Sequence, residues 1–447
     1  MRCGAWRRCL PDGVLHLSAG GSPFGVSSGG ASPRIGSPFL RPENIVHHTM
    51  PMSTTIASKA SSRISSMRPF LVKSLVVAIV GILTACSSVR LPPPDEAPAA
   101  PSRPTTSSVD DNSPLPPAMV QGKSRWQPVR YSELPGFDED ALHEAWNAWL
   151  KSCERPAPAF AALCPEIRRL SIASPDEQRA WIRQRLQPYR VEPLQGASDG
   201  LLTGYYEPLL DASRLPTAAQ SQPLYRPPAT LGSRRPWFTR QEIDTSADAR
   251  AALRGREIAY LADPLDAMML QIQGSGRLRV TEPDGTQRVI RVSFAGTNDQ
   301  PYRSIGSWLL QQGAVRDASW PGIKAWAQQN PQRLNELLWS NPRVTFFRDE
   351  PLLEMDASLG PRGAQGVALT PGRSIAVDRE SIPYGTPVWL ASPGPLVNLQ
   401  RLVLAQDTGS AIVGAVRADY FTGTGFDAGE IAGRLKQPLR LWVLWPR

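Results

Sequence analysis

The sequence is poor in histidine and cysteine, with four histidines and five cysteines among 447 residues. Most of them precede residue 87, and the rest of the chain keeps one histidine, His143, and two cysteines, Cys153 and Cys164. A zinc site built on histidines, or a nucleophile activated by a histidine, is therefore not expected. Chemistry on this chain is expected to rely on carboxylates.

The apolar run from Ser74 to Ala85 is shorter than the roughly 18 residues that a membrane span needs. It follows a short basic segment, 67–73, and ends in Leu83-Thr-Ala-Cys86, which resembles the lipobox of bacterial lipoproteins. We predict a lipoprotein signal peptide over residues 67–85, with Cys86 lipidated as the new N-terminus. A buried helix or an uncleaved anchor is the alternative. Residues 1–66, rich in Gly, Ser and Pro, are predicted to be a non-native extension.

The net charge of +9 belongs mostly to this N-terminal part. Without the nine basic and two acidic residues before residue 87, 40 basic and 38 acidic residues remain, a net charge of about +2. The basic composition therefore gives no reason to expect nucleic acid as a partner.

Residues 86–124 are dense in Pro, Ser and Thr, and we predict a tether between the lipid anchor and the folded body. The body, residues 125–447, is long enough for two domains. In a compartment that oxidises thiols, Cys153 and Cys164 are expected to form a local disulfide. Two free, buried cysteines are the alternative.

The body is predicted to begin with helices and to continue mainly as β-structure. Apolar residues from Leu142 to Leu150 recur at helical spacing, and Ser174-Pro-Asp-Glu177 is typical of a capped helix N-terminus. Short β-type runs follow, and closely spaced short strands favour barrels. The expected strands include 200–208, 268–277, 288–294, 344–348 and 441–445, with helical stretches at 302–312 and 320–339.

Three aspartates, Asp378, Asp407 and Asp419, stand at the ends or edges of short apolar runs near the C-terminus. Asp407-Thr-Gly matches the short pattern of aspartic proteases, which need two equivalent aspartates sharing a proton. The motif occurs once in the sequence, so this class is not expected. Asp beside Gly is also common in turns, which is the structural alternative for each aspartate taken singly.

Residues 372–447 resemble the three-aspartate (3D) domain of double-psi β-barrel cell-wall enzymes. The signatures are Gly372 to Asp378, Ile382 to Thr386, Ala405 to Gly409 and Gly414 to Asp419. Four upstream segments are similar to the membrane-bound lytic murein transglycosylase A family: Thr203 to Tyr206, Leu270 to Leu278, Asn341 to Arg348 and Gly363 to Gly366. The resemblance implies a mainly β fold with N-terminal helices. The implied fold comprises a double-psi β-barrel domain (125–208 and 341–447), a smaller inserted β-barrel-like domain (209–340) and a groove between them.

The family's catalytic acid matches Asp419, and its supporting aspartates match Asp407 and Asp378. The implied substrate-binding residues are Thr203, Tyr206, Gln273 and Gly409, whereas Glu207 stands where another member has threonine. No metal or other cofactor is implied. The implied partners are peptidoglycan glycan strands in the groove, the outer membrane through lipidated Cys86, and other cell-wall enzymes. The protein would then face the periplasm, and Ser87 after the lipidated cysteine favours the outer membrane.

The implied reaction cleaves the β-1,4 bond between MurNAc and GlcNAc without water and leaves 1,6-anhydroMurNAc ends, with Asp419 acting first as acid and then as base. A solvated aspartic acid has a pKa of about 3.9, so a catalytic acid needs burial or a nearby carboxylate. Asp407 would either raise the pKa of Asp419 or orient it. The alternatives are a peptidoglycan hydrolase, in which a second carboxylate activates water, and a non-catalytic glycan-binding lipoprotein.

Overall fold

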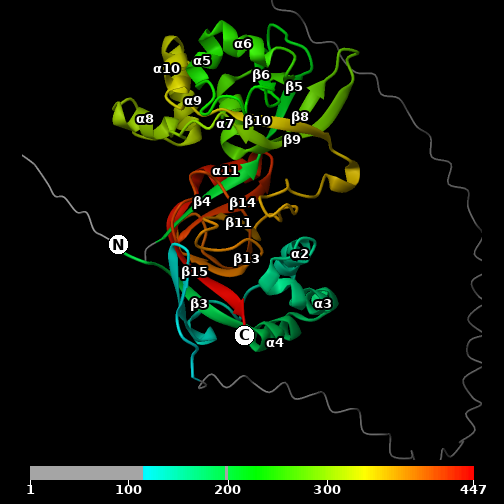
Figure 1. Cartoon of the computed structure of the whole chain (residues 1–447), viewed down its shortest axis with the longest axis vertical. Coiled ribbons are helices and arrows are strands. Elements are labelled where there is room, and N and C mark those ends of the chain that lie inside the picture. Colours follow the sequence, from blue (N-terminus) through cyan, green and yellow to red (C-terminus); the bar gives the residue numbers. More distant parts are fainter. Residues whose placement is uncertain (1–113, 197–199) are drawn as a thin grey trace, which may run out of the picture. The chain divides into compact units, whose positions relative to one another are not determined.

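The computed structural model describes residues 114–196 and 200–447. The predicted extension, signal peptide and lipidation site Cys86, and the tether as far as residue 113, lie outside these residues. The described chain contains a nine-stranded and a six-stranded β-sheet, with helices packed beside them (Figure 1). The prediction of a mainly β fold with helices is confirmed.

The nine-stranded sheet combines strands from both ends of the described chain. In spatial order they are β1 (Met119–Gln121), β2 (Ser124–Pro128), β3 (Leu186–Pro193), β15 (Lys436–Pro446), β12 (Pro387–Ser392), β13 (Leu399–Asp407), β11 (Ser374–Val377), β14 (Arg417–Thr424) and β4 (Gly200–Glu207). β15 also pairs with β4, from Lys436 opposite Thr203 to Leu439 opposite Gly200. This second pairing links β15, β12, β13, β11, β14 and β4 into a barrel-like ring.

Apolar side chains from all six strands of the ring form one buried cluster inside it. The cluster includes Leu202, Ile375, Leu390, Val403, Ala418 and Leu441. Successive side chains of a strand point to opposite faces, so the residues between these positions face outward. The outward positions are where the ring can present polar side chains to a substrate.

Three helices cover the outer face of β12, β13 and β15: α2 (Leu142–Ser152), α3 (Cys164–Arg169) and α4 (Pro175–Arg185). Trp146 and Trp149 of α2 meet Trp181 of α4 with ring centroids 5.8 and 5.6 Å away. Ser174 caps α4 together with Glu177, as the sequence predicts. These three helices leave the outer face of β11, β14 and β4 uncovered. Short 3-10 helices connect these and later elements: η1 (Tyr131–Glu133), η2 (Pro158–Leu163), η3 (Leu170–Ile172), η4 (Pro331–Arg333) and η5 (Glu354–Asp356).

Cys153 and Cys164 form a disulfide between the end of α2 and the start of α3, which confirms the favoured prediction. Both cysteines are buried among the residues that hold the helices on the barrel. Replacing both with serine is expected to lower the free energy of unfolding by about 3 kcal/mol, because a short closed loop is released in the unfolded chain. Urea denaturation checks this. A reductant should destabilise the wild type and leave the double variant unchanged, and equal stability of the two proteins would contradict the expectation.

The six-stranded sheet has the order β10 (Thr345–Pro351), β9 (Gln287–Thr297), β8 (Ser275–Thr281), β5 (Leu209–Ser213), β7 (Glu257–Leu261) and β6 (Gln222–Tyr225). Its apolar core includes Leu261, Leu278, Val292 and Phe347. Most of the remaining helices belong to this part of the chain: α5 (Arg240–Thr245), α6 (Ala247–Leu253), α7 (Pro264–Gln273), α8 (Ile305–Gln311), α9 (Trp320–Gln329) and α10 (Leu334–Trp339). α11 (Phe426–Arg434) packs on β4, where a Cβ at Gly204 would lie 2.7 Å from Ala432.

Three predicted segments differ from the structure. Residues 268–273 form the end of α7 and not a strand, because Asp263 caps that helix, Pro264 begins it and Gly274 ends it at a φ of 80°. The helical stretch 320–339 is divided into α9 and α10 around Pro331. β10 pairs with β9, so the six-stranded sheet extends past the predicted boundary at residue 340.

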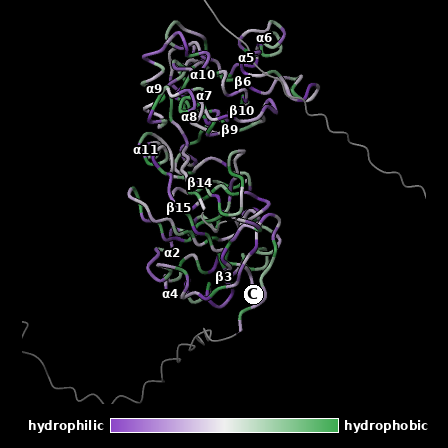
Figure 2. Tube along the Cα trace, turned by 90° about the vertical axis from the view of Figure 1, so that its left-hand side faces the viewer, coloured by the Kyte–Doolittle hydropathy of each residue, from purple (hydrophilic) through white to green (hydrophobic). Residues whose placement is uncertain are grey.

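Within the described ranges, no helix combines the length and the apolar character that crossing a membrane requires. Hydrophobic and hydrophilic segments alternate along the described chain (Figure 2).

Candidate active site on the outer face of the barrel

Asp419 lies on the side of the barrel that α2, α3 and α4 leave uncovered, on β14 between its neighbours β11 and β4. It pairs with Ala376 of β11 on one side and with Thr203 of β4 on the other. Ala418, the residue before it, points into the barrel core. The alternation of the strand therefore directs Asp419 outward, where the residue is half-buried.

Thr203 and Arg417 form a hydrogen-bonded chain that ends on Asp419. The Thr203 hydroxyl donates to Oδ1 of Asp419 at 2.6 Å and accepts a hydrogen bond from Nη2 of Arg417 at 2.8 Å. Arg417 also donates to the carbonyl of Leu201, which fixes the guanidinium along β4. The carboxyl group of Asp419 is therefore held in one orientation.

Burial raises the pKa of Asp419 to about 6. The hydrogen bond from Thr203 and the charge of Arg417 lower this pKa, and the charge of Asp407 raises it slightly. Burial is thus the main cause and Asp407 a minor one. An aspartic acid with this pKa is partly protonated near neutral pH, which is the condition for general acid catalysis.

Asp407, at the end of β13, is held by hydrogen bonds to both of its carboxylate oxygens. The backbone N–H of Ala364 donates to Oδ1 at 2.9 Å, and the hydroxyl of Tyr205 donates to Oδ2 at 3.0 Å. Burial raises its pKa, and hydrogen bonds from Thr408, Ala364 and Tyr205 lower it. Asp407 thereby joins the loop at residue 364 to β4.

Asp378, just after β11, is buried and also holds loops. Its Oδ1 accepts from the N–H of Glu380 at 3.0 Å, and its Oδ2 accepts from the N–H of Gly414 at 2.9 Å. Lys123 approaches the same oxygen at 3.5 Å. These contacts fix the turn after β11 and the loop that leads into β14, which carries Asp419.

The predicted substrate-binding residues fall at different places. Thr203 contacts Asp419 directly. Tyr206 points to the opposite face of β4, where a Cβ at Gly429 of α11 would lie 2.8 Å from its ring. The side-chain oxygen of Gln273 accepts from the N–H of Tyr206 at 3.0 Å. Gly409 belongs to the turn after β13, in which its carbonyl accepts from Ile412. Of the four predicted substrate-binding residues, Thr203 is thus the one that the structure places against Asp419.

Three side chains near Asp419 were not predicted as site residues: Arg417 and Tyr205, which lie within the family motifs, and Tyr302, which belongs to none of them. Arg417 precedes Asp419 by two residues, and strand alternation therefore puts both on the same face, a signal that the sequence contains. The ring of Tyr205 packs on Phe421 with centroids 5.3 Å apart, outside the barrel core. Tyr302 lies near enough for the charge of Asp419, after the larger effect of burial, to raise its pKa. Its position depends on the packing of distant segments, so sequence spacing gives no sign of it.

Among residues 114–196 and 200–447, no group of three or more His, Cys, Asp or Glu side chains could hold a metal ion.

Two family models match adjoining parts of the chain. The model of the MltA specific insert domain matches residues 201–348, and that of the 3D domain matches residues 373–445. Among proteins with curated names, membrane-bound lytic murein transglycosylase A of Escherichia coli (strain K12) is 32% identical over 272 residues, covering 58% of this chain and 69% of that protein. The curated relatives, the Vibrio cholerae protein among them, are matched over 65 to 70% of their own length.

Solved structures resemble the described chain over more of their length. The lytic transglycosylase LtgG of Burkholderia pseudomallei is 44% identical with a TM-score of 0.51, covering 75% of this chain and 98% of that chain. A monoclinic crystal form of MltA from Neisseria gonorrhoeae is 30% identical with a TM-score of 0.60, covering 75% of this chain and 96% of that chain.

Proposed function

The chain belongs to the membrane-bound lytic murein transglycosylase A (MltA) family, and we propose that it cleaves the β-1,4 bond between MurNAc and GlcNAc of peptidoglycan without water. The products are a glycan end with 1,6-anhydroMurNAc and a released GlcNAc end. The observation that carries the proposal is Asp419, an outward-facing carboxyl group with a pKa of about 6 and a fixed orientation.

In the first step, protonated Asp419 donates its proton to the glycosidic oxygen, and the bond from that oxygen to C1 of MurNAc breaks. Positive charge develops at C1 and on the ring oxygen. Thr203 holds the carboxyl group from the β4 side, so that its proton can be directed at the glycosidic oxygen.

In the second step, the C6 hydroxyl of the same MurNAc attacks C1, and Asp419, now a carboxylate, takes the hydroxyl proton. The new bond joins O6 to C1, Asp419 returns to its protonated form, and no water is consumed. An intramolecular nucleophile gains from its high effective concentration, so one carboxyl group is sufficient. Arg417, through Thr203, supports the charged form of Asp419 between the two steps.

Asp407 and Asp378 position this site and do not act on the substrate. Both oxygens of each carboxylate accept hydrogen bonds from the protein, which supports a role in holding loops. A hydrolase needs a second carboxylate free to activate water, and these contacts disfavour Asp407 for that task. A non-catalytic glycan-binding protein has no need for the raised pKa of Asp419.

The rate is expected to fall with rising pH above about 6, because Asp419 must carry a proton to act as acid. We expect kcat/KM to decrease about tenfold for each pH unit beyond this pKa. Initial rates on isolated glycan strands between pH 4.5 and 8.5 measure the profile. An Asp427→Asn variant, altered at an exposed carboxyl of α11, should keep the same profile. A rate that rises from pH 6 to 8 would contradict the role of Asp419 as acid.

Digestion of purified sacculi with the protein, followed by mass analysis of the muropeptides, tests the proposed reaction. Anhydro ends, lighter by one water than reducing ends, are the expected product. Reducing ends would identify a hydrolase, and the absence of any release would identify a glycan-binding protein.

The proposed setting is the periplasmic face of the outer membrane, with lipidated Cys86 as the anchor and residues 86–124 as the tether. The proposed domains are a double-psi β-barrel from residues 125–208 and 352–447, and an insert over residues 209–351 that includes β10, with the glycan strand in the groove between them. Other cell-wall enzymes are proposed as further partners. Labelling with radioactive palmitate tests the anchor, because Cys86→Ser should abolish incorporation while Cys153→Ser should not.

A further inference from the structure

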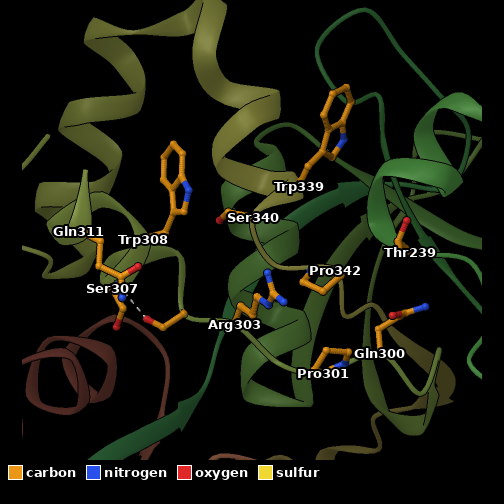
Figure 3. Close-up of a pocket in the computed structure, with 11 residues that line it drawn as sticks. Thr239, Gln300, Pro301, Arg303, Ser307, Trp308, Gln311, Trp339, Ser340 and Pro342 are labelled. Atoms are coloured by element: carbon orange, nitrogen blue, oxygen red, sulfur yellow. Dashed lines mark hydrogen bonds between the residues drawn. The ribbon is translucent and has the colours of Figure 1, made fainter. Parts of the chain in front are cut away.

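A cavity of about 720 Å³ lies in the part of the chain that carries the six-stranded sheet. It is lined by the segment from Gln300 to Gln311, by the turn from Trp339 to Pro342 and by Thr239 (Figure 3). Trp308 and Trp339 stand on opposite sides of it, and Arg303 lies between them in the view of Figure 3. None of the residues described above as contacting Asp419 lines this cavity.

The electrostatic character of this cavity favours an anion. No Asp or Glu occurs among the described residues that line it, and Arg303 is the charged residue among them. The Arg303 side chain is exposed, and no carboxylate or other acceptor of the described chain pairs with its guanidinium. The remaining polar lining consists of neutral hydroxyl and amide groups, such as Ser304, Ser340 and Gln300.

The two indole walls are held in place by contacts behind them. Nε1 of Trp339 donates to Oδ2 of Asp244 at 2.7 Å. The ring of Trp308 packs edge-on against Trp326 with centroids 6.4 Å apart. Fixed aromatic faces bind methyl and amide groups of a ligand at little cost in conformational entropy.

Tyr302 connects the rim of this cavity with the catalytic carboxyl group. It stands between Pro301 and Arg303, which both line the cavity, and the charge of Asp419 adds to the larger effect of burial in raising the pKa of its hydroxyl group. A glycan strand that extends from Asp419 along the segment after Tyr302 would reach this cavity.

We propose that the cavity binds the peptide stem of peptidoglycan, with a carboxylate of the stem on Arg303 and its alanine methyl and amide groups between Trp308 and Trp339. The inference rests on the proposed action on peptidoglycan. In that polymer GlcNAc is neutral and the lactyl carboxyl of a substituted MurNAc is an amide, so the stem peptide supplies the carboxylates. A guanidinium binds a carboxylate through paired, charge-assisted hydrogen bonds.

The test compares glycan strands that carry stem peptides with strands from which an amidase has removed them. For the wild type and the Arg303→Gln variant, kcat/KM is measured on both kinds of strand. We expect the variant to lower the ratio of peptide-bearing to peptide-free kcat/KM about tenfold, through KM, which corresponds to about 1.4 kcal/mol. Arg303→Lys should keep part of the preference, because the charge remains and the paired geometry is lost.

Arg254→Gln is the matched control, since Arg254 is exposed at the end of α6 and does not line the cavity; its ratio should equal that of the wild type. An equal loss on both kinds of strand in Arg303→Gln would overturn the inference and identify a neutral glycan subsite. Unchanged kcat/KM values on both kinds of strand would also overturn it. Failure of the proposed function would look different, because the wild type would then release no anhydro products from either strand.

Discussion

Replacing Asp419 with asparagine is expected to lower the rate of anhydro-product release by about a thousandfold or more. An amide has no proton to donate at neutral pH and cannot take one from the C6 hydroxyl, so both steps lose their catalyst. Its side-chain oxygen can still accept the hydrogen bond from Thr203, which preserves the local geometry. Release of muropeptides from sacculi, followed over time by chromatography, measures the rate.

The same variant should remain folded, which separates loss of chemistry from loss of structure. The pKa of Asp419 is higher in the folded than in the unfolded chain, so the folded state binds this proton more tightly. Its contribution to stability is complete below about pH 4 and is lost as the pH rises through about 6. Asp419→Asn should therefore be at least as stable as the wild type at pH 8. If the variant is unfolded at pH 8, this expectation is wrong, and its loss of activity would be explained by unfolding and not by the missing proton donor.

Replacing Glu207 with alanine is expected to lower the free energy of unfolding by about 3 to 5 kcal/mol, the largest effect on stability that we predict. Glu207 is fully buried at the end of β4. Its oxygens accept from Nε of Arg277 on β8 and Nε of Arg291 on β9, both at 2.7 Å, and from the hydroxyl of Thr424 at 2.8 Å. Removing the carboxylate leaves two nearly buried guanidinium groups without their counter-charge.

Urea denaturation of Glu207→Ala measures this effect, and Glu336→Ala is the matched control. Glu336 pairs with Arg333 on the surface, where an ion pair contributes at most about 1 kcal/mol. A loss below 1 kcal/mol in Glu207→Ala would show that the buried ion pairs contribute little. In the sequence, Glu207 is notable only because another family member has threonine at this position. In the structure, its ion pairs link β4 of the nine-stranded sheet to β8 and β9 of the six-stranded sheet.

Local patterns in the sequence predicted the elements whose signals are complete within a few residues. The helical spacing around Trp146 and the capping box at Ser174 each correspond to a helix in the structure. The strand predicted at Met268 was wrong because an apolar run of this length fits a helix or a strand equally well. Its flanking signals, Asp263 with Pro264 and then Gly274, identify the helix.

The candidate site depends on contacts that local patterns do not contain. Thr203 and Asp419 are 216 residues apart in the chain and meet because β4 and β14 are neighbours in the ring. Tyr205 reaches Asp407 across 202 residues for a similar reason. The motifs predicted the three aspartates as site residues, but strand alternation and pairing determine that Asp419 faces outward while Asp378 holds loops.

Digestion of peptidoglycan in heavy-oxygen water tests the central claim most directly. If the C6 hydroxyl of MurNAc is the nucleophile, the product ends are anhydro sugars and carry no heavy oxygen from the solvent. Mass spectrometry of the released muropeptides should show unlabelled anhydro ends with the wild type and none with Asp419→Asn. Heavy oxygen at C1 of newly formed reducing ends would contradict the account, because it would make water the nucleophile.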